Sequence, residues 1–279
     1  MADTILVATD GSSWAVAAER LAVALAAEHG WRILGLHVVD PRMLSAAYLA
    51  DLGGSTAAAF PPGFVARFEG ALEARGMAIL DGLGAACGEV QVPFERRLEH
   101  GFVDEAVCEA ARAACLVALG RLGAVGPWQR RILGSTAETA SRRSPVPVLV
   151  VPGESPVPPH RLLVAYDGGP QAGLALTWAA RLARKGTHPV TVLAVHEDAE
   201  EAQRIAGVGC ALLEADGVTA TAAHGRHDPA EEILGEATAA RHDLVIMGSS
   251  RHNVFRNWLL GSTAGRVMHE SPVPVLLCR

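Results

Sequence analysis

The chain has 279 residues, of which half are apolar and 19% are charged, a composition that excludes an intrinsically disordered protein. Its net charge is −6, and its Lys and Arg residues are scattered, which argues against a nucleic-acid-binding surface. No apolar run reaches the ~18 residues that span a bilayer, and the opening lacks a signal peptide's basic segment and cleavage site, so we expect a cytoplasmic protein without a membrane span.

The five cysteines form no CxxC pair and are odd in number. In a chain of this length, that spacing predicts reduced and mostly buried thiols rather than a disulfide framework.

The sequence contains an internal repeat. Near its start stands ILVATDGSSWAVAAERLAVALA, which returns as LLVAYDGGPQAGLALTWAARLA and places Asp10 opposite Asp167. Later stands LGSTAETASRRSPVPVLVVP, which returns as LGSTAGRVMHESPVPVLLCR and places Gly134 opposite Gly261. The first copy is about thirty residues longer, and most of that excess fits an insertion at about 41–70. We therefore predict two domains, 1–152 and 160–279, joined by the proline-rich segment PGESPVPPH.

In each copy, apolar runs of strand length alternate with segments whose Ala, Val and Leu residues recur at helical spacing. The first copy predicts strands at 5–9, 32–40, 91–98, 115–120 and 145–151, and helices at 13–29, 64–86, 103–113 and 135–142. The second copy predicts strands at 161–166, 189–196, 218–223, 244–247 and 273–278, and helices at 170–185, 198–215, 228–240 and 262–269. This alternation predicts parallel α/β sheets with helices on both faces.

Both final strands carry two prolines, at Pro145 and Pro147 and at Pro272 and Pro274. Because proline cannot donate to a strand ladder, we expect these strands to lie at sheet edges or to begin there. An edge strand is a natural place for two sheets to meet.

Two segments in each copy follow strand ends, where open α/β sheets bind ligands. Asp-Gly follows the first strand, and a glycine-rich segment (120–136 in the first copy, 248–263 in the second) follows the fourth and opens a helix with Gly-Ser-Thr. Glycine lets backbone N–H groups approach an anion closely, and a helix start favours phosphate. Basic residues add to this pattern: Arg121, Arg130, Arg131, Arg251, His252 and Arg256.

The pairing of (V/I)xxD(G) at the first strand with G-x2-G-x9-G-(S/T) after the fourth resembles the universal stress protein family. The resemblance covers nearly the whole chain, twice, including the terminal SPVPVL strands. It implies two doubly wound, Rossmann-like parallel sheets of five strands each, in the order 3-2-1-4-5. It also implies that the two halves pair through their last strands as a dimer within one polypeptide, with a further homodimer left open.

Members of the family's ATP-binding branch hold adenine and ribose near the Asp and the second strand, and phosphates on the glycine-rich segment. The resemblance therefore implies ATP as ligand, with or without Mg²⁺. Carried over by position, the first site comprises Ala8, Asp10, Val38, Leu119, Gly120, Gly123, Gly134, Ser135 and Thr136. The second comprises Ala165, Asp167, Met247, Gly248, Arg251, Gly261, Ser262 and Thr263, with either His196 or Glu197 as the counterpart of Val38.

Both copies depart from the family pattern. The first has ten residues, not nine, before Gly134, and the second has Arg251 in place of the second glycine. The Arg251 side chain would either pair with a phosphate or occupy the space that the phosphate needs.

Some of these residues have purely structural alternatives. Asp10 and Asp167 suit the N-terminal cap of the first helix, and Ser135 with Glu138 forms the pattern of a capping box. We interpret His224 and His227 as loop histidines rather than metal ligands, because no third ligand lies at a fitting spacing and the matching place in the first copy has only His100.

These patterns predict a nucleotide-binding protein rather than an enzyme, and the resemblance implies a sensor or regulator of the stress response. The sequence has no nucleophile elbow, Walker lysine motif, HExxH motif or paired carboxylates at a useful spacing. The alternatives are a module that binds a protein or lipid partner without nucleotide, and slow ATP hydrolysis with no identifiable base.

Overall fold

The computed structural model describes residues 3–44, 63–123, 133–153, 158–183, 188–249 and 261–279. The first half contains β1 (Thr4–Ala8), α1 (Ser13–His29), β2 (Arg32–Val39), the 3-10 turn η1 (Pro41–Leu44), α3 (Phe64–Glu89), β3 (Phe94–His100), α4 (Val103–Ala110), the 3-10 turn η2 (Ala111–Ala113), β4 (Leu116–Gly120), α5 (Ser135–Arg143) and β5 (Val148–Val151). The second half contains β6 (Leu162–Ala165), α6 (Pro170–Ala183), β7 (Val190–Val195), α7 (Ala199–Ala215), β8 (Ala220–Gly225), α8 (Pro229–Ala239), β9 (Leu244–Gly248), α9 (Ser262–Glu270) and β10 (Val275–Cys278).

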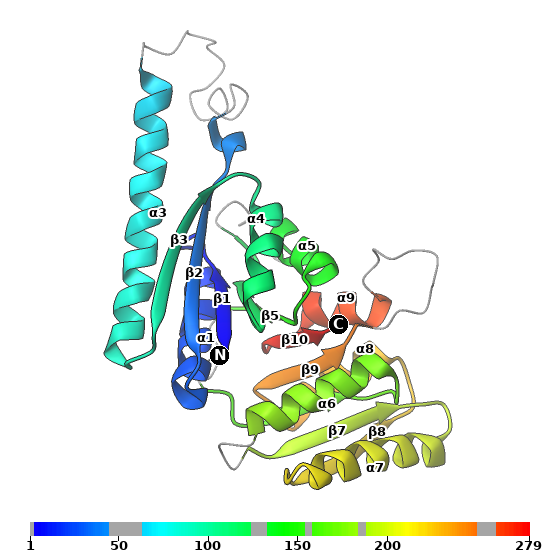
Figure 1. Ribbon diagram of the computed structural model, residues 1–279. Helices are drawn as coiled ribbons and strands as arrows, with labels where there is room; N and C mark the ends of the chain where they lie inside the picture. Colours follow the sequence, from blue (N-terminus) through cyan, green and yellow to red (C-terminus); the bar gives the residue numbers. More distant parts are fainter. Residues whose placement is uncertain (1–2, 45–62, 124–132, 154–157, 184–187, 250–260) are drawn as a thin grey trace.

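The strands form one ten-stranded sheet in the order β3-β2-β1-β4-β5-β10-β9-β6-β7-β8 (Figure 1). Within each half the order is 3-2-1-4-5 and the strands are parallel, which confirms the predicted topology. The two five-stranded sheets are continuous because β5 and β10 pair antiparallel, with Val148–Val150 opposite Val275–Leu277.

Alternate strand residues point to opposite faces of the sheet, so each strand contributes to two cores. In β1, Ile5 and Val7 pack in a cluster that includes α1 and α6, whereas Leu6 packs in a cluster that includes α5 and α9. Each cluster contains residues of both halves, so the two halves share their cores. Cover on both faces explains why the strands read as continuous apolar runs.

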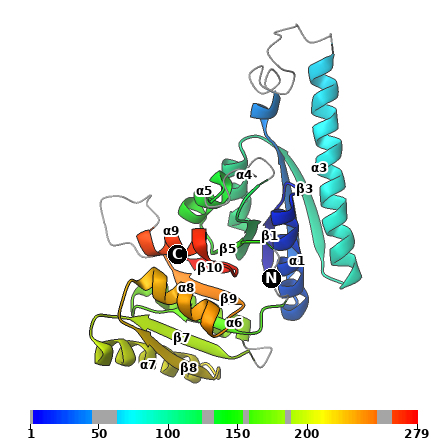
Figure 2. The same ribbon diagram turned by 180° about the vertical axis from the view of Figure 1, so that it is seen from behind.

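Helix α3 is the main difference between the halves. It has 26 residues, whereas its counterpart α7 has 17, and its N-terminal end projects beyond the sheet (Figures 1 and 2). The start of α3 at Phe64 lies within the predicted insertion, of which 45–62 lie outside the described residues.

Two arginine side chains, each directly after the carboxyl end of a strand, link the halves. Arg121 donates from Nη1 to the carbonyl oxygens of His269 (3.0 Å) and Ser271 (2.9 Å), where α9 ends. Arg279 reciprocates by donating to the carbonyl oxygen of Ser141 near the end of α5 (3.4 Å). A cation at a helix C-terminus satisfies carbonyls that lack a partner within the helix and interacts favourably with its dipole. Each half therefore supports the last helix of the other.

A second link lies at the amino ends of the strands. The guanidinium of Arg181 lies 4.5 Å from the ring centroid of Trp31 in the first half and 4.7 Å from that of Trp178 in its own. Arg181 also forms an ion pair with Asp3 of the first half. Partly buried cation–π contacts of this kind are stabilising, so Arg181 adds a second link between the halves.

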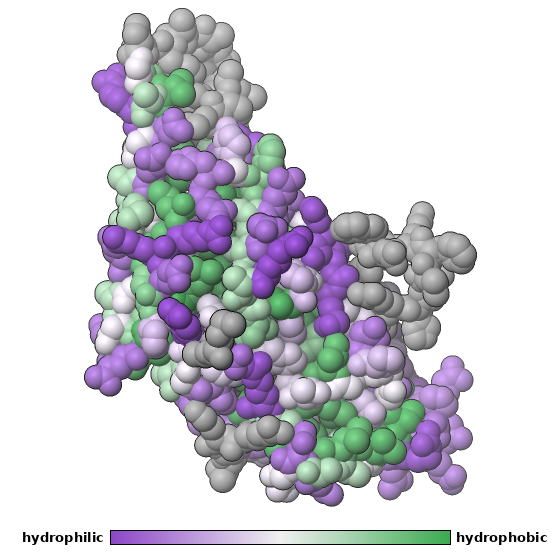
Figure 3. All heavy atoms as spheres, viewed as in Figure 1, coloured by the Kyte–Doolittle hydropathy of each residue, from purple (hydrophilic) through white to green (hydrophobic). Residues whose placement is uncertain are grey.

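The surface mixes hydrophilic and apolar residues. Apolar residues gather toward the lower right of Figure 3, in the region of α6 and α7, which carry the exposed Leu174, Val208 and Leu212. Exposed apolar side chains in small groups are ordinary on folded proteins. Among the described helices, none combines the length and apolarity that a bilayer crossing requires.

All five cysteines are free thiols, and Cys87, Cys210 and Cys278 are buried, as the sequence predicted. Burial raises the pKa of Cys278 in β10 to about 12, which keeps this thiol protonated at neutral pH.

Two glycines at strand ends permit a close approach of helix and sheet. A Cβ atom on Gly120, the last residue of β4, would lie 2.6 Å from the carbonyl carbon of Trp14 in α1. A Cβ atom on Gly248, the last residue of β9, would lie 2.6 Å from that of Gln171 in α6. Packing against helix backbone therefore requires glycine at both positions.

We expect Gly120→Ala to lower the free energy of unfolding by about 1–3 kcal/mol, because the backbone of α1 cannot yield to the added methyl group. Gly82→Ala is the matched control, since a Cβ atom on this α3 residue meets nothing within 4 Å. That change should raise stability by about 0.5–1 kcal/mol through helix propensity. Urea unfolding measures both, and equal effects of the two substitutions would contradict the packing argument.

A second prediction concerns the seam between the halves, which is the pairing of Val148–Val150 in β5 with Val275–Leu277 in β10. Separating β5 from β10 requires opening the shared cores, so their backbone amides should exchange with solvent as slowly as those of β1. The outer edge strand β8 should exchange faster. Hydrogen exchange followed by mass spectrometry tests this, and rapid exchange in Val148–Val151 and Val275–Cys278 beside a protected β1 would count against the seam.

Candidate functional site

The carboxyl ends of the first and fourth strands lie side by side in both halves. Val7 of β1 pairs with Ala118 of β4, and Ala165 of β6 pairs with Met247 of β9. The Asp-Gly turns and the glycine-rich segments therefore leave the sheet next to each other, as expected for a ligand site between strands of an open sheet.

The Asp-Gly turn has the same geometry twice. Asp10 accepts through Oδ1 a hydrogen bond from the Ser12 backbone N–H (2.9 Å), and Asp167 accepts one from that of Gly169 (2.8 Å). Gly11 has a φ of 74°, in the left-handed region that favours glycine. Each aspartate thus stabilises the turn that leads from its strand into the next helix.

The capping interpretation of Asp10 is wrong. The N-cap of α1 is Ser12, whose Oγ accepts from the backbone N–H of Ala15 (3.2 Å). Asp10 lies two residues earlier and stabilises the preceding turn. The sequence signal for Ser12 was present, since a serine directly preceding a helical stretch is a preferred cap.

The capping box proposed for Ser135 is also wrong. The N-cap of α5 is Gly134, which has no side-chain cap hydrogen bond, and Ser135 is the first residue of the helix. The Glu138 side chain instead pairs with Arg142 one turn further along α5. The start of α5 is thus not capped by its own serine.

Gly123 brings the turn and the glycine-rich segment together. A Cβ atom at this position would lie 2.9 Å from Oδ2 of Asp10. A Cβ atom on Gly134 would lie 3.8 Å from the Gly123 nitrogen. The structure therefore places Asp10, Gly123 and the N-terminus of α5 at one point, although they are far apart in the sequence.

The N-terminal turn of α5 presents the amides that suit an anion. The Gly134 N–H already donates to the carbonyl oxygen of Arg121 (2.8 Å). The amides of the first helical turn, from Ser135 onward, have no partner within the helix because of helix geometry. Ser135 is exposed and Thr136 is half-buried, so this turn faces solvent. In the second half, Gly261 caps α9 in the same way, with Ser262 exposed and Thr263 half-buried.

Leu119 and Met247 differ from the other predicted site residues. Their side chains are only 2% and 4% exposed and belong to the core. Only their backbone could therefore contact a ligand. Ala8, Val38 and Ala165 are partly buried near the carboxyl ends of their strands, with side chains packed on the core.

Strand register corrects the counterpart of Val38. Ala8 pairs with Leu36 in the first half, and Ala165 pairs with Leu193 in the second. The residue two positions further along is Val38 in one half and Val195 in the other, so both His196 and Glu197 were wrong assignments. Val195 is partly buried beside the core, as Val38 is.

The first half supports its turn with polar residues that the sequence analysis missed. The Thr9 hydroxyl donates to the Glu19 carboxylate of α1 and accepts from the Gly11 N–H (3.2 Å). Nδ1 of His37 in β2 lies 2.8 Å from the Thr9 carbonyl oxygen. Burial raises the pKa of Glu19 and lowers that of His37. A network of this kind fixes the backbone that carries Asp10.

The second half has no such network at the matching places. In the repeat, Thr9 and Glu19 correspond to Tyr166 and Leu176, and strand register matches His37 with Ala194. The sequence signal for this network was the difference between the copies at these three positions, which are polar in the first copy and mostly apolar in the second.

Arg121 does not have its predicted place among the phosphate-binding charges, because its guanidinium bonds to the carbonyls that end α9. Burial lowers its pKa. The other basic residues of the two glycine-rich segments, Arg130, Arg131, Arg251, His252 and Arg256, lie outside the described residues, and so does most of each segment.

Comparisons with known proteins point to one family over nearly the whole chain. The model of the universal stress protein family matches residues 1–152, 159–209 and 194–279. Universal stress protein Slr1230 of Synechocystis is 25% identical over 291 residues, 99% of either chain, and one from Mycolicibacterium smegmatis is 28% identical over 303 residues, 99% of this chain and 96% of the relative. The crystal structure of a universal stress protein from Archaeoglobus fulgidus has the same fold, with a TM-score of 0.78 at 22% identity over 99% of this chain and 96% of that chain.

The Glu19 carboxyl gives a prediction for stability. Because burial raises its pKa above the ordinary value of 4.5, the folded state binds this proton more tightly than the unfolded state does. Wild-type stability should therefore fall as the pH rises through the raised pKa. Glu19→Gln keeps an acceptor for Thr9 but cannot ionise, so the stability of this variant should not fall in the same way.

We expect the free energy of unfolding of Glu19→Gln, relative to wild type, to increase from pH 4.5 toward about pH 7. Urea unfolding across this range measures the difference. A difference that does not change with pH would contradict the burial of an ionisable carboxyl beside Thr9.

Proposed function

Since this chain belongs to the universal stress protein family as a tandem member, we propose that it is a nucleotide-binding sensor or regulator with ATP as its ligand. The carrying observation is that Asp10, Gly123 and the N-terminus of α5 meet at the carboxyl edge of the sheet. This arrangement offers a carboxylate for sugar hydroxyls and helix amides for phosphate within one site.

In the first site, the roles follow from charge. A carboxylate repels phosphates, so Asp10 would accept hydrogen bonds from ribose hydroxyls, while Ala8 and Val38 border the adenine. The polyphosphate would lie along Gly123 toward Ser135 and Thr136, where first-turn amides and the positive end of the α5 dipole attract negative charge. Any Mg²⁺ would arrive with the phosphates.

The second site would bind nucleotide in the same way with fewer supports. Asp167 is exposed and Ala165 and Val195 lie beside it, while Ser262 and Thr263 open α9. We expect weaker binding here, because no counterpart of the Thr9–Glu19 hydrogen bond fixes the turn.

We further propose that the halves work as an intramolecular dimer in which each senses the other. The backbone N–H of Leu133, next to the α5 N-cap, donates to Nδ1 of His269 in α9 (3.1 Å). Together with the bonds of Arg121 to the end of α9, this contact joins both ends of the first glycine-rich segment to the other half. A change in the conformation of that segment on ATP binding would therefore alter its contacts with α9.

Catalysis forms no part of the proposal. Around the described part of the first site, the Glu19 carboxylate is engaged by Thr9 and the Asp10 carboxylate by the Ser12 amide. We assign neither carboxylate a role as a base for water, and a measurement of phosphate release from ATP checks this assignment.

Ser135→Asp and Ser262→Asp test the two sites separately. An aspartate in the first turn of a helix stabilises the helix, yet it repels a bound polyphosphate. Each substitution should therefore preserve the fold and weaken ATP binding at its own site at least about ten-fold, or 1.4 kcal/mol. Equilibrium dialysis with MgATP should show two bound nucleotides in wild type, one in each single variant and none in the double variant.

Ser135→Asn and Ser262→Asn are the neutral controls and should retain both nucleotides. Substitution of Gly120 is unsuited to this test, because it disturbs the packing of β4 on α1. The proposal is overturned if wild type binds ATP no more tightly than about 1 mM, or if the double Asp variant binds as wild type does.

A further inference from the structure

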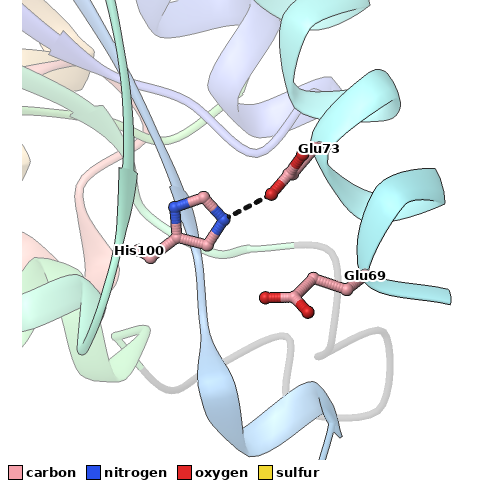
Figure 4. A group of neighbouring side chains, drawn as sticks. All are labelled: Glu69, Glu73 and His100. Atoms are coloured by element: carbon pink, nitrogen blue, oxygen red, sulfur yellow. Dashed lines mark hydrogen bonds and ion pairs between the residues drawn. The ribbon is translucent and has the colours of Figure 1, made fainter. Parts of the chain in front are cut away.

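A second cluster of ligand-type side chains lies outside both candidate nucleotide sites. Glu69 and Glu73 lie on α3, and His100 ends β3 (Figure 4). One ligand atom from each of the three lies within 4.8 Å of the other two. Nε2 of His100 lies 2.9 Å from Oε1 of Glu73, and Glu69 points toward the same space (Figure 4).

The composition of this cluster favours a cation. Two glutamates four residues apart share one face of a helix and repel each other unless a positive charge lies between them. The imidazole comes from a different element and adds a nitrogen donor to the two carboxylates. A set of one nitrogen and two carboxylate ligands suits a divalent transition ion such as Zn²⁺.

Packing fixes the distance between the two elements that carry these ligands. Gly76, one turn after Glu73, lies so close to β2 and β3 that a Cβ atom there would be 2.5 Å from the His37 ring and 2.8 Å from Cδ1 of Leu98. His100 is held in register by pairing with Val39. The donors are thus held near one another before any ion binds, which lowers the ordering cost of binding.

Among the described residues, the second half has no counterpart of this cluster. Helix α7 begins at Ala199 and is shorter than α3, so it lacks the turns that carry Glu69. Strand register matches His100 with Arg226 in the second half, which is not a metal ligand. The second half has the same strand order without these three side chains, so the cluster is not required for the fold.

We propose that Glu69, Glu73 and His100 bind one divalent transition-metal ion, with Zn²⁺ as the reference, and that the ion clamps the projecting end of α3 to β3. The side chains of His100 and Glu73 are 50% and 44% exposed, so water completes the coordination and exchange with solvent is open. The proposal is independent of nucleotide binding. The alternative is that His100 and Glu73 form a surface ion pair that Glu69 does not share.

Glu69→Gln separates these two possibilities, because it leaves the His100–Glu73 pair intact while removing one metal ligand. Titration of the full chain with Zn²⁺ in a calorimeter should show one site, weakened at least ten-fold by Glu69→Gln and by His100→Asn. The double variant His224→Ala/His227→Ala is the matched control for other histidines and should bind as wild type does. All of these positions are on the surface, and circular dichroism verifies the fold.

Hydrogen exchange supplies a readout besides affinity. Zn²⁺ should slow exchange in the first turns of α3 in wild type and in the His224→Ala/His227→Ala variant, but not in Glu69→Gln. The proposal is overturned if wild type has no Zn²⁺ site, if Glu69→Gln binds as tightly as wild type, or if the loss of His224 and His227 abolishes the site.

Discussion

The antiparallel pairing of β5 with β10 is the constraint on which the rest of the structure depends. It joins three residues of each final strand, yet it makes two five-stranded sheets continuous and lets their cores merge on both faces. The reciprocal bonds of Arg121 and Arg279 to helix ends, and the place of Arg181 between two tryptophans, follow from that alignment. Backbone pairing sets the geometry, and these side chains then stabilise it.

Local sequence pattern was enough to predict most element bounds, whereas the strand order was predicted from the resemblance to the universal stress protein family. The final strands begin directly after Pro147 and Pro274, as the missing donors of proline require. The third strand begins at Phe94 rather than near Gln91, because Gln91 turns the chain with a φ of 57°. In the second copy the matching turn contains Gly217, and glycine favours a positive φ. Comparing the two copies could therefore have placed this turn, although Gln91 by itself gives no such signal.

The site was less accessible from sequence because its details come from contacts between distant segments. Asp10 and the glycine-rich segment could be paired through a motif, but the role of Glu19 depends on the fold of α1 back onto Thr9. Arg121 looked like a phosphate ligand because it neighbours glycines, whereas its partner lies in the other half. Motifs predict which elements meet, and only the fold decides where a long side chain points.

The continuous sheet also has a consequence for how the protein responds to concentration. A pair of separate subunits falls apart on dilution and exchanges partners with similar chains, whereas covalently joined halves stay at a high effective concentration for each other. The two halves therefore keep a fixed one-to-one ratio at any expression level. Each is also held to one specific partner, so the polar network around Thr9 in one half and the apolar residues in its place in the other can diverge without ever forming a mixed assembly.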